Sequence, residues 1–189
     1  NTEYIYLPSG YRSDGFQMTE EFYIEICKEI KSHLQNADPD SLHQRLNTQV
    51  LISIIQGQVN MYFGSGKCDE TKRKQIYKYD SKEKPYGRNS LGIHTLKGKN
   101  VARCIERAAA CNGLANFFGM DCSLVYSDIT NEDGRDGHAY CLLHDNGEYS
   151  IWDTSRYVKM QNGRLAPYKF HLDFKKPSEP VKFPGIQLK

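Results

Sequence analysis

The order of secondary-structure signals in this 189-residue chain predicts an α+β fold, with helices first and antiparallel strands last. Three observations support this prediction. Apolar residues recur at helical spacing in the first third of the chain, and a further helical pattern covers residues 101–118. After it, Asn146-Gly147 and Asn162-Gly163 separate segments of strand-forming residues and predict two hairpins.

The first helix is expected to run from Thr19, a good N-cap residue, to about Gln35. Within it an apolar residue returns at every fourth position: Phe22, Ile26, Ile30 and Leu34. Asp38-Pro39 is a second helix-start signal, because proline suits the first position of a helix. This second helix is expected to be more buried and to reach about Met61.

The chain is expected to form a single domain over residues 1–189, since a chain of this length can bury a sizeable core. Its parts are a helical N-terminal part over 1–63, a loop-rich segment over 64–98, and a core with C-terminal strands over 99–189. Glycine and proline punctuate the middle segment, so we interpret it as loop with short elements and as the rim or lid of a site.

The composition excludes several classes of protein. Hydrophobic residues make up 39% and charged residues 25%, as in globular proteins, and a net charge of +2 does not favour a nucleic-acid partner. No apolar run is long enough for membrane insertion. The sequence does not predict an oligomeric state. Six cysteines without a CxxC pair favour free thiols in a reducing, cytoplasmic compartment. Because the chain starts at Asn1 rather than Met, trimming and secretion stay open.

Cys104 falls in the first turn of the helix predicted over 101–118. At a helix N-terminus the unpaired N–H groups and the positive end of the dipole stabilise a thiolate, and Arg103 and Arg107 add positive charge nearby. A thiolate becomes an effective nucleophile when a base, held by a third group, lies beside it.

His138 and Asp153 are the candidates for that base and its partner, because they lie on the two strands of the first predicted hairpin. A hairpin centred on Asn146 places residue 154 opposite His138, so that Asp153 is one position away. A slip of one residue would reverse which side chains face each other.

Several stretches of residues 91–156 form a recognisable series: "IHTLKGKNVARC" leading to Cys104, a helix ending at Gly119-Met120, a strand, then "HAY" and "WDTS". This series resembles the core of the transglutaminase-like cysteine-enzyme superfamily, which has a papain-like fold. Two positions depart from the family pattern. Arg103 replaces a small residue, and Val101-Ala102 stands where a glycine is common.

The resemblance implies a helical N-terminal half whose nucleophile-bearing helix packs on an antiparallel sheet. It implies Cys104 as nucleophile, His138 as general base and acid, and Asp153 as the group that fixes the imidazole tautomer. The Cys104 backbone N–H would help to stabilise the oxyanion, with Gln75 and His94 as candidates for a second donor. No cofactor is implied.

The family's reactions are acyl transfers at amide carbonyls. The chain is therefore expected to act on protein or peptide amide bonds as a cysteine peptidase or amidohydrolase. The alternatives are an inactive binding module of the same fold, or a protein-glutamine transglutaminase or deamidase. Tyr140 and Trp152, beside the two polar residues of the hairpin, are expected to contact the substrate, although Trp152 is equally suited to the core.

Other cysteines allow other interpretations. "MDCSLV" around Cys122 resembles the signature of bacterial cell-wall endopeptidases, in which the cysteine heads a helix. A metal site could combine His138, Cys141 and His144 with another thiol, but residues three apart on a strand point to opposite faces, so we predict no metal. Cys111 and Cys141 lie in apolar segments and are expected in the core.

Overall fold

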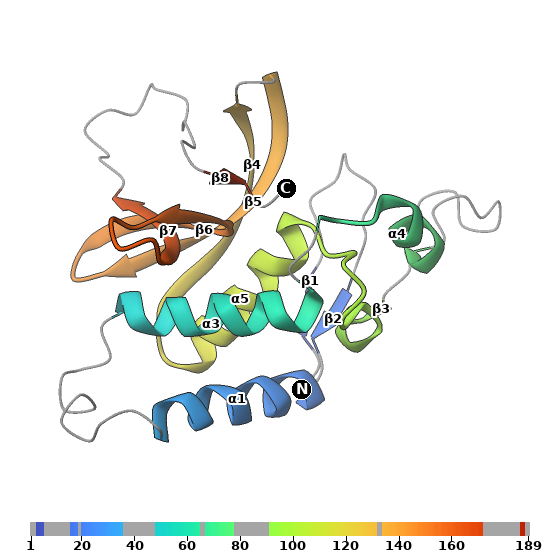
Figure 1. The fold of residues 1–189 in the computed structure, drawn as a ribbon, viewed down its shortest axis with the longest axis horizontal. Coiled ribbons are helices and arrows are strands. Elements are labelled where there is room, and N and C mark those ends of the chain that lie inside the picture. The colour runs from blue at the N-terminus through green and yellow to red at the C-terminus, as the bar shows by residue number, and fades with distance from the viewer. Residues whose placement is uncertain are drawn as a thin grey trace. The chain divides into compact units, whose positions relative to one another are not determined.

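The computed structural model describes residues 3–5, 16–18, 20–35, 48–64, 67–77, 91–131, 134–171 and 186–187 (Figure 1). Among these residues helices precede a mainly antiparallel sheet, so the α+β class is confirmed. Contacts divide the chain into two compact units, one within residues 1–45 and 58–102 and the other within 46–57 and 103–189. Helix α3 (Thr48–Phe63) gives its first part to the second unit and its last part to the first.

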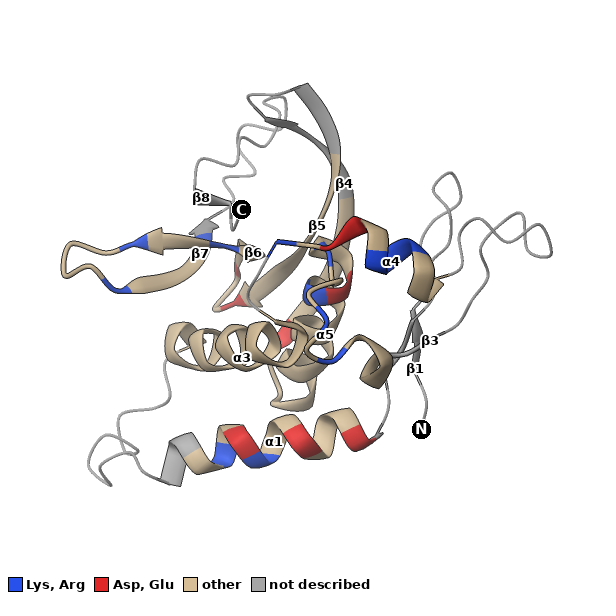
Figure 2. Cartoon of the chain, turned by 45° about the vertical axis from the view of Figure 1, so that its right-hand side comes forward, with Lys and Arg blue, Asp and Glu red and all other residues tan. Residues whose placement is uncertain are grey.

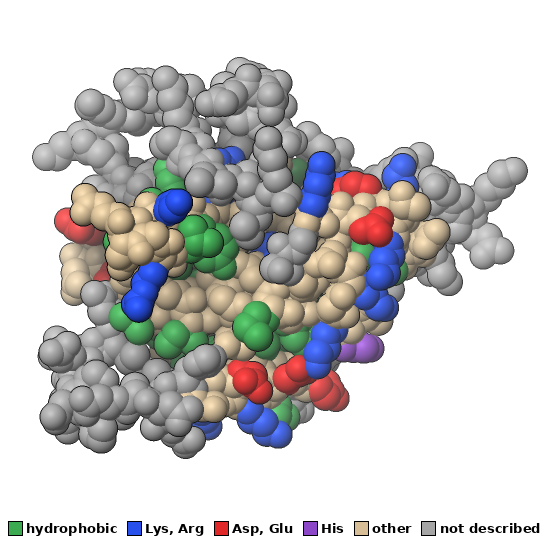
Figure 3. Space-filling view, viewed as in Figure 1, with side chains coloured by type: hydrophobic (Ala, Val, Ile, Leu, Met, Phe, Trp, Pro, Cys, Tyr) green, Lys and Arg blue, Asp and Glu red, His purple; other side chains and the backbone are tan. Residues whose placement is uncertain are grey.

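In the first unit, helix α1 (Glu20–Gln35) has the predicted bounds. Phe22, Ile26 and Ile30 are buried, as their spacing predicts. Phe22 packs edge-to-face on Tyr62 of α3, with ring centroids 4.9 Å apart. Figure 2 shows acidic and basic residues along α1, and the space-filling view in Figure 3 shows charges of both signs on the molecule's surface. Exposed charged residues of α1 include Glu21, Lys28 and Lys31.

The same unit contains a small sheet of three short strands, β1 (Glu3–Ile5), β2 (Phe16–Met18) and β3 (Leu91–Gly92). Strands β1 and β2 are antiparallel, whereas β2 and β3 are parallel. The 3₁₀ helix η1 (Ile93–Leu96) follows β3 directly. The predicted start of the second helix at Asp38-Pro39 lies outside the described residues.

Helix α4 (Glu70–Tyr77) is a regular element inside the segment predicted to be loop-rich. Asp69 accepts a hydrogen bond from the Lys72 N–H, 3.0 Å away, and so caps its first turn. Its buried residues are Arg73 and Tyr77, four positions apart, with the guanidinium over the ring. The hydrophobic pattern missed this helix because one member of its buried pair is an arginine. Arg73 also donates to the carbonyl oxygen of Val101 at 2.8 Å.

The second unit is built on an antiparallel sheet in the order β4-β5-β6-β7, with β8 paired to β6. The strands are β4 (Asp121–Asn131), β5 (Gly134–Asp145), β6 (Glu148–Lys159), β7 (Leu165–His171) and β8 (Ile186–Gln187). Both predicted hairpins are confirmed, since β5 turns into β6 at Asn146-Gly147 and β6 into β7 around Asn162-Gly163. No helix in the described part of the chain is long and apolar enough to cross a membrane.

Helix α5 (Cys104–Phe117) packs against β4, β5 and β6 (Figure 1). Its buried face is rich in alanine, which allows the helix to approach the sheet closely. Cys141 of β5 donates from its thiol to the carbonyl oxygen of Ala108 at 3.3 Å. Cys111 and Cys141 are fully buried, which confirms their assignment to the core.

The first hairpin differs from the prediction by one residue of register. Asn146 and Gly147 have φ of 52° and 79°, so the loop has two residues and Asp145 pairs with Glu148. Continuing this register places Ser155, not residue 154, opposite His138. Asp153 is then two positions from the direct partner, on the same face as His138 rather than the opposite one.

Candidate active site

Cys104 is the first residue of α5 and is half-buried. The residue before it, Arg103, is extended (φ −97°, ψ −172°) and exposed. The Arg103 N–H donates to the carboxylate of Glu106 at 2.8 Å, and the Glu106 side chain is fully buried. This contact fixes the turn from which the thiol projects. The helix starts three residues later than the predicted 101, and Cys104 lies in its first turn as predicted.

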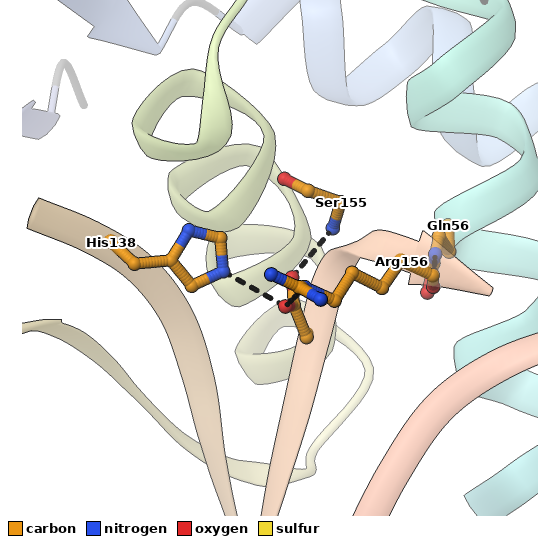
Figure 4. Close-up of polar contacts among 5 residues, drawn as sticks. Gln56, His138, Ser155 and Arg156 are labelled. Atoms are coloured by element: carbon orange, nitrogen blue, oxygen red, sulfur yellow. Dashed lines mark hydrogen bonds and ion pairs between the residues drawn. The ribbon is translucent and has the colours of Figure 1, made fainter. Parts of the chain in front are cut away.

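His138 and Asp153 form a buried pair. The His138 Nε2 atom lies 2.8 Å from Oδ2 of Asp153, and the two residues are 5% and 0% exposed. An ionised carboxylate only accepts hydrogen bonds, so Nε2 carries a proton and Nδ1 is the nitrogen that can gain or lose one. Figure 4 shows the ring between the two strands with Nε2 directed at the carboxylate.

The Asp153 carboxylate has two further contacts (Figure 4). The Nε atom of Arg156 lies 2.9 Å from Oδ2, and the Ser155 backbone N–H donates to Oδ1 at 3.0 Å. Arg156 is itself 5% exposed. The carboxylate thus shares a buried position with a permanent cation and an imidazole.

The Cys104 thiol is one of the groups that set the pKa of His138. Burial disfavours the imidazolium, but hydrogen bonds to Asp153 and to the Cys104 thiol, together with their charges, outweigh burial and raise the pKa of His138 to about 9. At neutral pH the ring is therefore protonated. The protonated ring thus lies within hydrogen-bond reach of the thiol at the N-terminus of α5.

This raised pKa predicts how stability depends on pH. The pKa of His138 is about 9 in the folded chain and near the ordinary 6.5 in the unfolded chain. The protonated imidazole therefore stabilises the folded state fully below pH 6.5, and this contribution is lost as the pH rises through about 9. Its size is on the order of 3 kcal/mol. Urea unfolding of wild type and His138→Gln at pH 6 and pH 9.5 measures it. The difference in free energy of unfolding between the two proteins should be smaller at pH 9.5 than at pH 6. An equal difference at both pH values would contradict the raised pKa of His138.

Of the residues expected to contact substrate, Trp152 has no exposed surface. Its indole N–H donates to Oε1 of Gln56 at 2.7 Å, so the side chain lies in the core, the alternative position expected for it. Tyr140 is 7% exposed and lies two positions from His138 on the same strand, with ring centroids 6.3 Å apart. Gln75 and His94 are exposed residues of the first unit.

Other cysteine and histidine sites do not resemble this one. Cys122 lies within β4 and is 6% exposed, so the interpretation that it heads a helix is wrong. His144 bonds Asp121 on the neighbouring strand at 3.0 Å and stacks on Tyr149, both partners being partly exposed. Within the described residues, no three His, Cys, Asp or Glu side chains are arranged to hold a metal ion.

Arg156 and Gln56 were not identified from the sequence. The Nε2 atom of Gln56, on α3, donates to the backbone carbonyl oxygen of Arg156 at 2.9 Å. Arg156 follows Asp153 by three positions, which on a regular strand points it to the opposite face. The register of β6 with β7 shifts between Asp153 and Tyr157, and this irregularity brings the guanidinium to the carboxylate.

Comparison with known proteins adds little. No family model matches this chain, and no curated protein matches it. A solved structure described as "Crystal structure of a TGase" matches with a TM-score of 0.42 and 14% sequence identity. The match covers 72% of this chain and 33% of that one, so the chain spans about a third of that protein's length. A likeness this distant concerns the fold at most and gives no support for the chemistry of the site.

Proposed function

We propose that this chain is a cysteine-dependent acyl-transfer enzyme that acts on amide bonds of proteins or peptides. The observation that carries the proposal is the buried His138–Asp153 pair, 2.8 Å apart, whose imidazole also interacts with the thiol at the start of α5. Nucleophile, proton carrier and orienting carboxylate thus come from α5, β5 and β6. The assignment of a transglutaminase-like, papain-like core belongs to the same proposal.

In the proposed reaction, the Cys104 thiolate attacks the carbonyl carbon of the substrate amide and forms a C–S bond. His138 donates its Nδ1 proton to the leaving nitrogen as the C–N bond breaks, and an amine departs. The neutral imidazole then takes a proton from water, which attacks the thioester and releases the acid and the thiolate. The Cys104 backbone N–H, at the start of the helix, would stabilise the developing negative charge.

Asp153 acts through the ring. By accepting from Nε2 it holds the tautomer in which Nδ1 faces the thiol, and it stabilises the imidazolium. Arg156 lies 2.9 Å from the same Oδ2 atom and helps to hold the carboxylate in place. Hydrolysis is the proposed outcome because water needs no binding site of its own, whereas cross-linking needs a bound amine.

The test is incubation of the purified chain with a defined peptide mixture, with and without a fluorescent primary amine, read by mass spectrometry. New peptide termini indicate hydrolysis, glutamate in place of glutamine indicates deamidation, and an amine adduct indicates transfer. The expected result is new termini that the Cys104→Ala variant does not produce. If wild type and Cys104→Ala leave the peptides equally unchanged while binding them equally well, the inactive binding module is the better account.

A further inference from the structure

Arg156 sits in surroundings that are unfavourable for an arginine unless its charge is compensated. It is 5% exposed, and its Nε lies 2.9 Å from Oδ2 of Asp153, which is fully buried. Removing one partner of a buried ion pair leaves the other charge uncompensated. The same Oδ2 atom accepts from His138, so the guanidinium and the imidazole share one oxygen.

The backbone that presents Arg156 is irregular. Strand β6 pairs with β7 up to Asp153↔Tyr168 and again from Tyr157↔Pro167, with a shift of register between them. Within this stretch Arg156 pairs with β8 instead. The irregular stretch has fewer ladder hydrogen bonds to β7, so a further group that bonds to it would help to fix its geometry beside β8.

Gln56 is that group. Its side chain is fully buried, and both ends of the carboxamide are used. Oε1 accepts from the Trp152 indole at 2.7 Å, and Nε2 donates to the Arg156 carbonyl oxygen at 2.9 Å. One side chain of α3 therefore ties together the residues on either side of the irregular stretch, and Asp153 lies between them.

We propose that Arg156 and Gln56 are positioning residues for the imidazole of His138. Arg156 holds the Oδ2 atom of Asp153 toward Nε2 through the buried ion pair, and Gln56 fixes the strand segment that carries both residues. This inference rests on the proposed function, because its consequence is the reactivity of the Cys104 thiol. Both residues are proposed to act through the Asp153 carboxylate and its strand, not on the reacting atoms.

The experiment measures iodoacetamide alkylation of Cys104 at pH 6.5 by peptide mass spectrometry, which needs no substrate. Arg156→Gln is expected to lower the rate about tenfold, because the Asp153 carboxylate loses the cation of its buried ion pair. Gln56→Leu removes the neutral hydrogen bonds of the carboxamide and should lower the alkylation rate of Cys104 about threefold. Arg156→Lys should recover part of the loss, because it keeps the charge without the planar fork.

Ile151→Ala is the matched control. Ile151 is buried on the same strand, packs with Tyr140 and Tyr168, and has no polar side-chain group to bind the carboxylate. Its truncation should lower the melting temperature while the alkylation rate stays within about twofold of wild type. Cys68, another half-buried thiol, is the internal reference within each sample. A merely structural role for Arg156 predicts that alkylation follows the melting temperature in all variants alike.

A folded Arg156→Gln variant that alkylates Cys104 at the wild-type rate would overturn the inference. If Arg156→Gln does not fold, Gln56→Leu decides, and a wild-type rate in that variant has the same meaning. The failure of the proposed function looks different. Wild-type Cys104 would then react no faster than Cys68, with or without His138.

Discussion

Replacing Cys104 by alanine is expected to abolish amide turnover, with a loss in kcat of at least about a thousandfold. The variant removes the only atom that forms a bond to the substrate in the proposed reaction. Because the side chain is half-buried at a helix start, truncation should change stability little. The measurement is peptide turnover by wild type and Cys104→Ala at pH 7, with circular dichroism to establish that both are folded.

Cys68→Ala provides the matched control for this loss. Cys68 has similar exposure, and its thiol donates to the Val101 carbonyl oxygen at 3.3 Å in the segment that leads to Cys104. Its removal should leave kcat within a few-fold of wild type, as a surface-proximal substitution outside the site does. Equal losses in the two variants would mean that the segment, rather than the Cys104 thiol, is what turnover depends on.

Replacing Asp153 by alanine is expected to lower the free energy of unfolding by about 3–5 kcal/mol, because it leaves the buried Arg156 charge without its partner. The fully buried carboxylate holds Arg156, His138 and the Ser155 N–H at once. Loss of the pair should also slow alkylation of Cys104, since the imidazole loses its anchor. Urea unfolding at pH 7 measures the stability change.

The double variant Asp153→Ala/Arg156→Met separates the two causes of this loss. Removing both charges eliminates the uncompensated cation, so the double variant should be more stable than Asp153→Ala alone. Its Cys104 should remain slow to alkylate, because the anchor of the ring is still absent. A loss below about 1 kcal/mol in Asp153→Ala would contradict the description of a closely coupled buried pair.

The positions of the three proposed catalytic groups along the chain could be predicted from local signals. The helix that starts at Cys104 has a clear periodicity and a glycine stop, and Asn146-Gly147 is among the strongest short hairpin signals. These two features alone place His138 and Asp153 on adjacent strands. The predicted pairing was nevertheless wrong by one residue, because a three-residue turn was assumed where the loop has two.

That single residue matters because side chains alternate between the faces of a strand. The predicted register would have placed Asp153 on the face away from His138, whereas the two-residue loop puts them on the same face. The sequence could not decide this, since Asp145, Asn146 and Gly147 are all acceptable in either turn. Only the positive φ of Asn146 distinguishes the two turns.

The supporting residues could not be predicted because they depend on long-range and irregular structure. Arg156 reaches Asp153 only through a shift of register in β6, and Gln56 reaches that segment from a helix 100 positions earlier in the chain. Neither contact produces a periodic pattern of residues in the sequence that could predict it. The burial of Arg73, which anchors α4, could not be predicted either, because a charged residue in a helix is normally expected to face solvent.

The most direct test of the central claim is the rate of iodoacetamide alkylation of each of the six cysteines between pH 5 and pH 9, in wild type and His138→Ala. The thiolate–imidazolium pair predicts that Cys104 reacts faster than every other cysteine at pH 6.5, and that this advantage disappears without His138. If Cys104 reacts no faster than the buried Cys111, or if Cys122 is the most reactive thiol, the proposed nucleophile is wrong.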